Sequence, residues 1–260
     1  MFSGRELIAR SGDLLAETVL IEGYEGEAIP AYLARPTGAG PFPSVVVLHH
    51  RDGWDLESKE IVLRFAMEGY ACILPHLHHR WAPGESAERA AELSLAAGGV
   101  SNDQVVADTA GALNYLTKQS YTSGKVGVIG YCSGGRQAFY VSAVMPFDAT
   151  IMCYGPKIIA AESDLNAVTP IAPITLAHQI TGPVLGLYGA EDKNPSPETV
   201  AIVAAELKQL GKQHKIVSYP DAGHAFFAVN KPSYRVQAAK EGWREVFAWF
   251  DQYLRPEGSS

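Results

Sequence analysis

The stretch that decides the fold is Lys125-Val126-Gly127-Val128-Ile129-Gly130-Tyr131-Cys132-Ser133-Gly134-Gly135. Its first half is a short apolar run of β-branched residues, which predicts a buried strand. Its second half, Gly-x-Cys-x-Gly-Gly, leads into a helical pattern from Arg136. A strand, a glycine-flanked reactive residue and a helix together form a nucleophile elbow, the sharp turn that lifts a side chain above a sheet. The stretch therefore predicts an elbow with Cys132 at its tip, and the alternative is a Gly-rich turn around a buried structural thiol.

Strand and helix patterns alternate on both sides of this elbow. Strands are expected at 18–22, 29–35, 44–48, 70–74, 149–154, 183–188 and 215–219, and helices at 57–68, 101–120, 197–210 and 233–254. The first two strands flank a Gly-containing turn and predict an antiparallel hairpin at a sheet edge. The alternation in the rest predicts the α/β class, with a mainly parallel sheet flanked by helices on both faces.

Composition limits the domain count and the partners. The chain has 260 residues, 47% of them hydrophobic, and no Pro/Ser/Gly-rich linker divides it, so we expect one domain with 1–15 and 256–260 peripheral. A net charge of −7 argues against nucleic acid and anionic membranes. Neither a signal peptide nor a bilayer-spanning run is evident, and three cysteines make no disulfide framework. We expect a cytoplasmic monomer or small homo-oligomer acting on a small molecule.

Three chemically suited residues follow three predicted strands. Cys132, Asp192 and His224 each lie where a strand ends, and ligands of parallel sheets bind at those ends. Their chain order, nucleophile then acid then histidine, is that of α/β-hydrolases. His224 would take the proton of Cys132, and Asp192 would hold the imidazole tautomer. Glu191 and Asp221 are rivals of Asp192 for that role.

The same arrangement predicts an oxyanion hole. Backbone N–H groups of Ser133, just after the nucleophile, and of Arg51, after an early strand, would bind the oxyanion. The expected cycle is attack on a carbonyl, an acyl-thioester intermediate and hydrolysis by water. Cys72 and Cys153 fall within predicted strands, where core packing is expected.

Histidines gather after two strands that could be neighbours. They are His49, His50, His76, His78 and His79. We see no metal-ligand spacing among them and expect a polar pocket rim without a metal. His50 and His78 are expected nearest the substrate. Trp54 and Trp81 would form an aromatic wall or would simply pack under the loops.

The motifs resemble a known family. Gly-Tyr-Cys-Ser-Gly-Gly at 130–135, Gly-Ala-Glu-Asp at 189–192 and Ala-Gly-His-Ala-Phe-Phe at 222–227 are similar to those of dienelactone hydrolases (carboxymethylenebutenolidases) of the α/β-hydrolase superfamily. The resemblance extends from the strand at 44–48 to the last helix. It implies a hydrolase of lactones or esters that needs no cofactor, with a triad of Cys132, Asp192 and His224. It also implies that Arg80 binds a substrate carboxylate, for which a guanidinium is well suited.

Two positions depart from that family pattern. Where the family has a glutamate in the loop after an early strand, this chain has His50, and where it has a second carboxylate-binding arginine after the catalytic histidine, residues 225–228 end in Ala228 and hold no cation. These departures indicate a less charged or larger ester or lactone than dienelactone itself. The alternatives are a promiscuous thioesterase or phosphotriesterase using the same thiolate, and a non-catalytic member that serves as a binding module.

Overall fold

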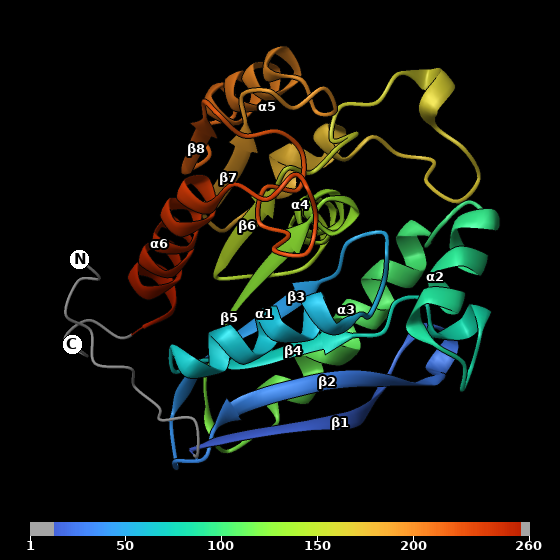
Figure 1. Ribbon diagram of the computed structural model, residues 1–260, viewed down its shortest axis with the longest axis vertical. Helices are drawn as coiled ribbons and strands as arrows, with labels where there is room; N and C mark the ends of the chain where they lie inside the picture. Colours follow the sequence, from blue (N-terminus) through green and yellow to red (C-terminus); the bar gives the residue numbers. More distant parts are fainter. Residues whose placement is uncertain (1–12, 256–260) are drawn as a thin grey trace.

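The computed structural model describes residues 13–255 (Figure 1). Its eight strands are β1 (Leu14–Glu22), β2 (Ala28–Pro36), β3 (Phe42–Leu48), β4 (Ala71–Pro75), β5 (Thr122–Tyr131), β6 (Ala149–Cys153), β7 (Val184–Gly189) and β8 (His214–Tyr219). Its α-helices are α1 (Leu56–Met67), α2 (Ala87–Ala96), α3 (Asn102–Thr117), α4 (Ser133–Val144), α5 (Pro197–Gln209) and α6 (Val236–Leu254). The expected α/β class and every predicted strand are present.

One sheet joins all eight strands in the order β1-β2-β4-β3-β5-β6-β7-β8. β1 and β2 form the predicted antiparallel hairpin at one edge, and β2 is also antiparallel to β4. All the pairs from β4 and β3 across to β8 are parallel. The mainly parallel sheet with its antiparallel edge is therefore confirmed. The carboxyl ends of β3, β5, β7 and β8 consequently meet at one edge of the sheet.

Alternating residues of the central strands enter two separate cores. In β3, Val45 and Val47 belong to one cluster and Val46 and Leu48 to the other, as period-two geometry requires. The first cluster holds the apolar faces of α1 and α6, and the second holds those of α3 and of much of α4. Figure 1 shows α1 in front of the sheet and α3 behind it. Helices on both faces explain why β3 reads as a continuous apolar run.

The first strand of the hairpin is longer than predicted. Leu14 and Leu15 already pair with Pro36 and Arg35, so β1 begins four residues earlier than predicted. Residues 1–12 and 256–260 lie outside the described residues. Within residues 13–255, no helix is both long enough and apolar enough to cross a membrane.

Two long excursions contain structure that the sequence patterns did not reveal. The first holds α2, whose N-terminus is capped by the Ser86 hydroxyl accepting from the N–H of Arg89. The second, between β6 and β7, contains only two short 3₁₀ helices, Glu162–Asp164 and Pro173–Gln179. Figure 1 shows this second excursion extending outward beyond α4. Ser86 could have indicated the start of α2 in the sequence. The helix itself is rich in alanine, so its apolar positions show only a weak helical periodicity.

We expect Phe65→Ala to destabilise the fold by about 3–5 kcal/mol, because a buried phenylalanine leaves a cavity when truncated. Phe65 is fully buried in α1, and its ring contacts those of Tyr70, Trp243 and Phe250. Urea unfolding followed by circular dichroism measures the loss. The matched control is Ile202→Ala on the exposed face of α5, where we expect little change. Equal losses for the two variants would contradict this account of the core.

Candidate active site

The elbow after β5 holds Cys132 in a conformation that side chains rarely adopt. Its φ of 54° and ψ of −119° turn the chain sharply between strand and helix. The turn is possible because its glycines lie against other backbone. A Cβ on Gly130 would collide with the carbonyl oxygen of Gly134, and one on Gly134 would collide with that of Leu48. The Cys132 N–H donates to the carbonyl of Cys153 in β6, at 3.0 Å, which fixes the turn to the neighbouring strand.

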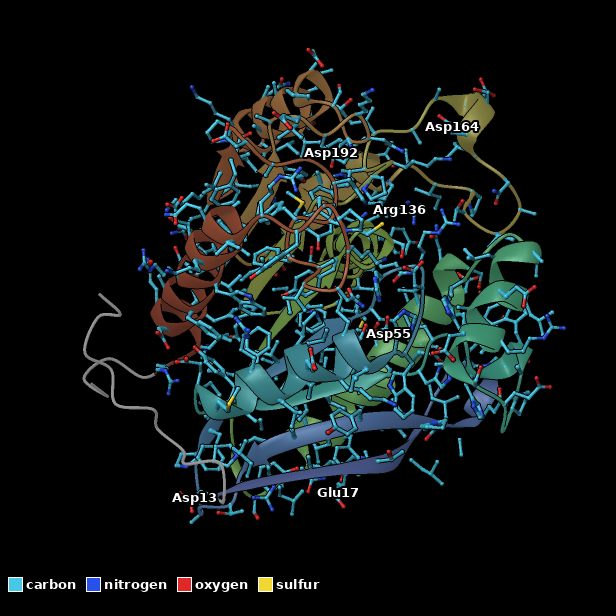
Figure 2. All side chains as sticks on the ribbon, viewed as in Figure 1. Asp13, Glu17, Asp55, Arg136, Asp164 and Asp192 are labelled. Atoms are coloured by element: carbon cyan, nitrogen blue, oxygen red, sulfur yellow. The ribbon has the colours of Figure 1, made fainter. Side chains whose placement is uncertain are left out.

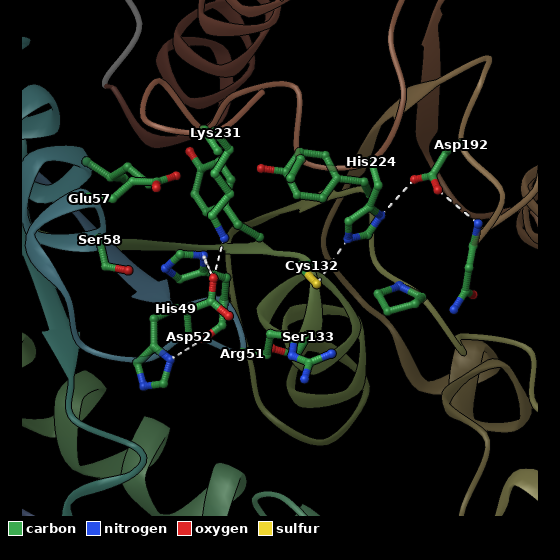
Figure 3. A pocket seen from close by; sticks show the side chains of 18 of the residues that line it. His49, Arg51, Asp52, Glu57, Ser58, Cys132, Ser133, Asp192, His224 and Lys231 are labelled. Carbon is green, nitrogen blue, oxygen red and sulfur yellow. Dashed lines mark hydrogen bonds and ion pairs between the residues drawn. The ribbon is translucent and has the colours of Figure 1, made fainter. Parts of the chain in front are cut away.

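The structure brings together the three residues predicted from the strand ends. The Nε2 atom of His224 lies 3.1 Å from the Sγ of Cys132, and its Nδ1 lies 2.8 Å from Oδ2 of Asp192 (Figure 3). The other carboxylate oxygen of Asp192 accepts from the N–H of Asn194 at 2.8 Å, so the acid is held from both sides. Asp192 is buried, whereas the rival Glu191 is exposed. Only the former reaches His224.

The surroundings of His224 favour a charged imidazole. Burial desolvates the ring and by itself lowers its pKa, but hydrogen bonds to Asp192 and Cys132 outweigh that effect and raise the pKa to about 9. An imidazolium beside a sulfur atom stabilises the thiolate form. Cys132 also stands at the N-terminus of α4, where the helix dipole favours negative charge. Burial instead raises the pKa of the Cys72 and Cys153 thiols, which fits inert core residues.

Tyr154 packs beside this triad and was missed by the sequence analysis. It has a φ of 39°, and its ring meets the His224 ring edge-on with centroids 5.1 Å apart. The side chain is buried among Phe226 and Phe227, and burial raises the pKa of its hydroxyl. Tyr154 could have been recognised by its left-handed backbone conformation, which is rare for a residue other than glycine. That conformation is visible in the structure and not in the sequence.

A cavity of about 680 Å³ opens over the triad. Ser133, Arg51 and His50 line it, as the sequence analysis expected. Figure 3 shows Ser133 and Arg51 beside Cys132. The cavity wall also includes His49, whose pKa is lowered to about 4 because burial disfavours its charged form. Its Nε2 accepts from the N–H of Leu77, so this imidazole is neutral and structural.

The assignment of Arg80 to carboxylate binding is wrong in this structure. Its guanidinium makes a bidentate pair with the fully buried Asp108, at 2.8 and 3.0 Å. Its Nε also lies 2.7 Å from Glu27, and its Nη2 donates to the carbonyl of Tyr24. These contacts join the β1–β2 turn to α3, and Arg80 does not line the cavity. Because the guanidinium already binds the carboxylates of Asp108 and Glu27, it has no pair of N–H groups left to bind a substrate carboxylate.

His78, Trp54 and Trp81 also lie away from the cavity lining, contrary to expectation. His78 is buried against His49 and Trp81, and burial lowers its pKa to about 2. Trp54 stacks on His76 with ring centroids 4.9 Å apart and donates to the carbonyl of Leu74. These rings pack under the loops that carry the cavity wall, which was the alternative interpretation of the two tryptophans.

Several charged residues of the cavity were not predicted, among them Glu57, Lys157, Lys193 and Lys231. Lys231 forms an ion pair with Asp52 across the two loops that follow β8 and β3. Figure 3 shows this pair on the side of the cavity away from Asp192. Glu57, in the first turn of α1, lines the same side. Lys231 follows His224 by seven residues, and no local pattern indicates that the loop returns to the cavity.

Comparison with known proteins places this architecture among hydrolases. The model of the dienelactone hydrolase family matches residues 29–254. A protein of Escherichia coli K12 named "Putative carboxymethylenebutenolidase" is 33% identical over 232 residues, covering 88% of this chain and 84% of its own length. One of the same name from Methylorubrum extorquens is also 33% identical, covering 92% and 82%.

The solved structures that resemble this chain include a protein described as a dienelactone hydrolase. The crystal structure of a "Putative Dienelactone Hydrolase" from Klebsiella pneumoniae has a TM-score of 0.83 and 31% identity, covering 92% of this chain and 99% of that one. A dienelactone hydrolase-like promiscuous phosphotriesterase from metagenomic libraries has a TM-score of 0.75 at 22% identity, covering 94% and 100%. The latter likeness is one of fold.

We expect Arg80→Met to lower stability by about 3–5 kcal/mol, because it leaves the carboxylate of Asp108 buried and unpaired. Turnover of p-nitrophenyl acetate per folded molecule should be unchanged, since Arg80 lies outside the cavity. Urea unfolding and steady-state kinetics measure the two effects. Arg89→Met, which breaks an exposed pair with Glu92, is the matched control and should alter neither. A raised KM with unchanged stability would restore Arg80 to substrate binding.

Proposed function

Because this chain belongs to the dienelactone hydrolase family, whose members act on ester or lactone bonds, we propose that it hydrolyses carboxylic esters or lactones with Cys132 as nucleophile. The observation that carries the proposal is the 3.1 Å approach of His224 Nε2 to Cys132 Sγ, with Asp192 on the far nitrogen. That distance permits proton transfer, and the third residue orients the base. The chain is a hydrolase of this type, and the identity of the nucleophile and of the substrate is our proposal.

In the first half-reaction the Cys132 thiolate attacks the substrate carbonyl carbon. A carbon–sulfur bond forms, and the carbonyl electrons move onto oxygen, where the backbone N–H groups of Ser133 and Arg51 would stabilise them. As the tetrahedral intermediate collapses, the carbon–oxygen bond breaks and His224 Nε2 gives its proton to the leaving alkoxide. An acyl-thioester and a neutral imidazole remain. For a lactone the alcohol stays tethered to the acyl group.

In the second half-reaction water enters the cavity. The neutral His224 takes a proton from water, and the resulting hydroxide adds to the thioester carbonyl. The second tetrahedral intermediate expels the Cys132 thiolate, which restores the thiolate–imidazolium pair. The carboxylic acid product loses its proton to solvent. Asp192 remains hydrogen-bonded to Nδ1 throughout and balances the imidazolium charge.

Neither position at which the family pattern would bind a substrate carboxylate is available in this chain. Arg80 is held by Asp108 and Glu27, and Ala228 carries no cation. A volume of about 680 Å³ also lies within the usual range for a small-molecule site. We therefore infer a less charged or larger ester or lactone than dienelactone as substrate. A panel that includes thioesters and phosphotriesters separates this activity from the alternative chemistries open to the same thiolate.

Cys132→Ala should abolish turnover of p-nitrophenyl acetate, because the acyl group then has no acceptor. Iodoacetamide should label the wild-type protein at Cys132, as shown by peptide mass mapping, and should inactivate it in parallel. The control is Cys153→Ala, which removes a buried thiol and should leave labelling at Cys132 unchanged. Retained turnover in Cys132→Ala would refute the assignment of the nucleophile.

The pH dependence of kcat/KM should show an alkaline limb near pH 9. Above the pKa of His224, which is raised to about 9, the imidazole has lost the proton that the leaving alkoxide needs. Asp192→Asn removes a carboxylate that raises this pKa, so the limb should move to lower pH. The same variant should lower kcat by about 10²-fold or more, because the imidazole loses its orienting partner. A limb that stays at pH 9 in Asp192→Asn would argue against the pair.

A further inference from the structure

We propose that His50, Asp55 and Glu57 form a binding site for a divalent transition-metal ion on the cavity wall. One ligand atom from each residue lies within 4.8 Å of the other two. The three belong to the loop after β3 and to the first turn of α1, and His50 and Glu57 line the cavity, which gives an ion a path of entry. The proposal does not depend on the proposed function, because it uses none of the triad residues.

Two of the three ligands are already oriented. Oδ1 of Asp55 accepts from the N–H of Ser58 at 2.9 Å, where it caps α1. This leaves Oδ2 of Asp55 directed at Nε2 of His50, at 2.8 Å. The His50 side chain is only 11% exposed. The contact with Ser58 would remain on binding an ion, whereas the His50–Asp55 hydrogen bond would be replaced by bonds from both residues to the ion.

The third ligand has an unused atom. The Oε2 atom of Glu57 is buried and has no hydrogen-bond partner among the described residues. The side chain of Asn230, which is not one of the three proposed ligands, forms a hydrogen bond with the same carboxyl group. A buried carboxylate oxygen without a partner is costly, and a cation would supply the missing interaction.

The second nitrogen of His50 has a carboxylate nearby. Its Nδ1 lies 3.9 Å from Oδ2 of Asp52, which is beyond hydrogen-bond distance, so the two groups would have to approach by about 1 Å. Histidines that bind metals usually donate their other N–H to a carboxylate, which fixes the tautomer. Placing the proton of His50 on Nδ1 frees the Nε2 lone pair for the ion. Lys231 is paired with Asp52, which limits its repulsion of a nearby cation.

The donor set and the spacing indicate which ions fit. One imidazole nitrogen and two carboxylate oxygens suit Zn²⁺ or Co²⁺ better than Ca²⁺ or Mg²⁺, which prefer more oxygen ligands. Ligands about 2.0 Å from a tetrahedral ion lie about 3.3 Å apart. The His50–Asp55 contact would therefore open by about half an ångström, and Glu57 would move inward. The fourth position faces the cavity and would hold water.

Cobalt binding tests the site in the chelator-treated Cys132→Ser protein, a background that removes the competing thiolate. Visible absorption of Co²⁺ reports ligand geometry, and Zn²⁺ competition reports affinity. We expect a saturable absorption typical of four- or five-coordinate Co²⁺, together with a higher melting temperature. In this background Glu57→Gln and His50→Gln should each weaken binding by at least about tenfold. Glu191→Gln, which alters an exposed acid on the same cavity, should bind Co²⁺ as the parent does.

Circular dichroism verifies that each variant is folded, and either ligand variant suffices if the other does not fold. The absence of saturable absorption would overturn the proposal. So would affinities unchanged in both Glu57→Gln and His50→Gln. Absorption lost in Asp192→Asn but kept in both ligand variants would place the ion on His224 and Asp192 instead.

Discussion

The structure depends on the close approach of backbone to backbone at the turn after β5. Gly130 and Gly134 allow the end of β5, the start of α4 and the carbonyl of Leu48 in β3 to meet without an intervening Cβ. This approach holds Cys132 at a φ of 54° and places its sulfur above the carboxyl ends of the strands. His224 comes from the loop after β8 and Asp192 from the loop after β7, so the parallel sheet delivers both to the same edge. Without the tight turn, the sulfur would not reach the imidazole.

Much of the fold and of the candidate triad could be predicted from the sequence, because the relevant signals are local. The central strands are mostly continuous apolar runs, the elbow is a contiguous motif, and Asp192 and His224 closely follow strands. The surrounding cavity could not be predicted in the same way. Arg80 looked free in the sequence because its partner Asp108 lies 28 residues further on, in a different element. His78 and Trp54 were misplaced because their ring contacts depend on how two loops pack together. Lys231 reaches the cavity only through a loop whose course no periodicity describes.

The cavity has two chemically distinct sides. On one side, Asp192 and an imidazole with a raised pKa face the sulfur of Cys132. On the other side, Asp52 and Glu57 line the cavity together with Lys231 (Figure 3). Figure 2 shows Asp192 and Asp55 well separated on the ribbon. The first side has the groups needed for acyl transfer, and the second adds an ion pair and a further carboxylate to the cavity wall.

The contacts of Arg80 have a consequence for how this scaffold can diversify. The guanidinium connects the β1–β2 turn, through Glu27 and Tyr24, to Asp108 in the middle of α3. These contacts restrain residues 75–81, because opening the segment would break the ion pair of Arg80 with the buried Asp108. Insertions that leave these contacts intact would have to lie elsewhere on the border of the cavity. The stretch between β6 and β7, which contributes Pro156 and Lys157 to the cavity, has the length and the sparse regular structure to absorb insertions without disturbing the reacting groups.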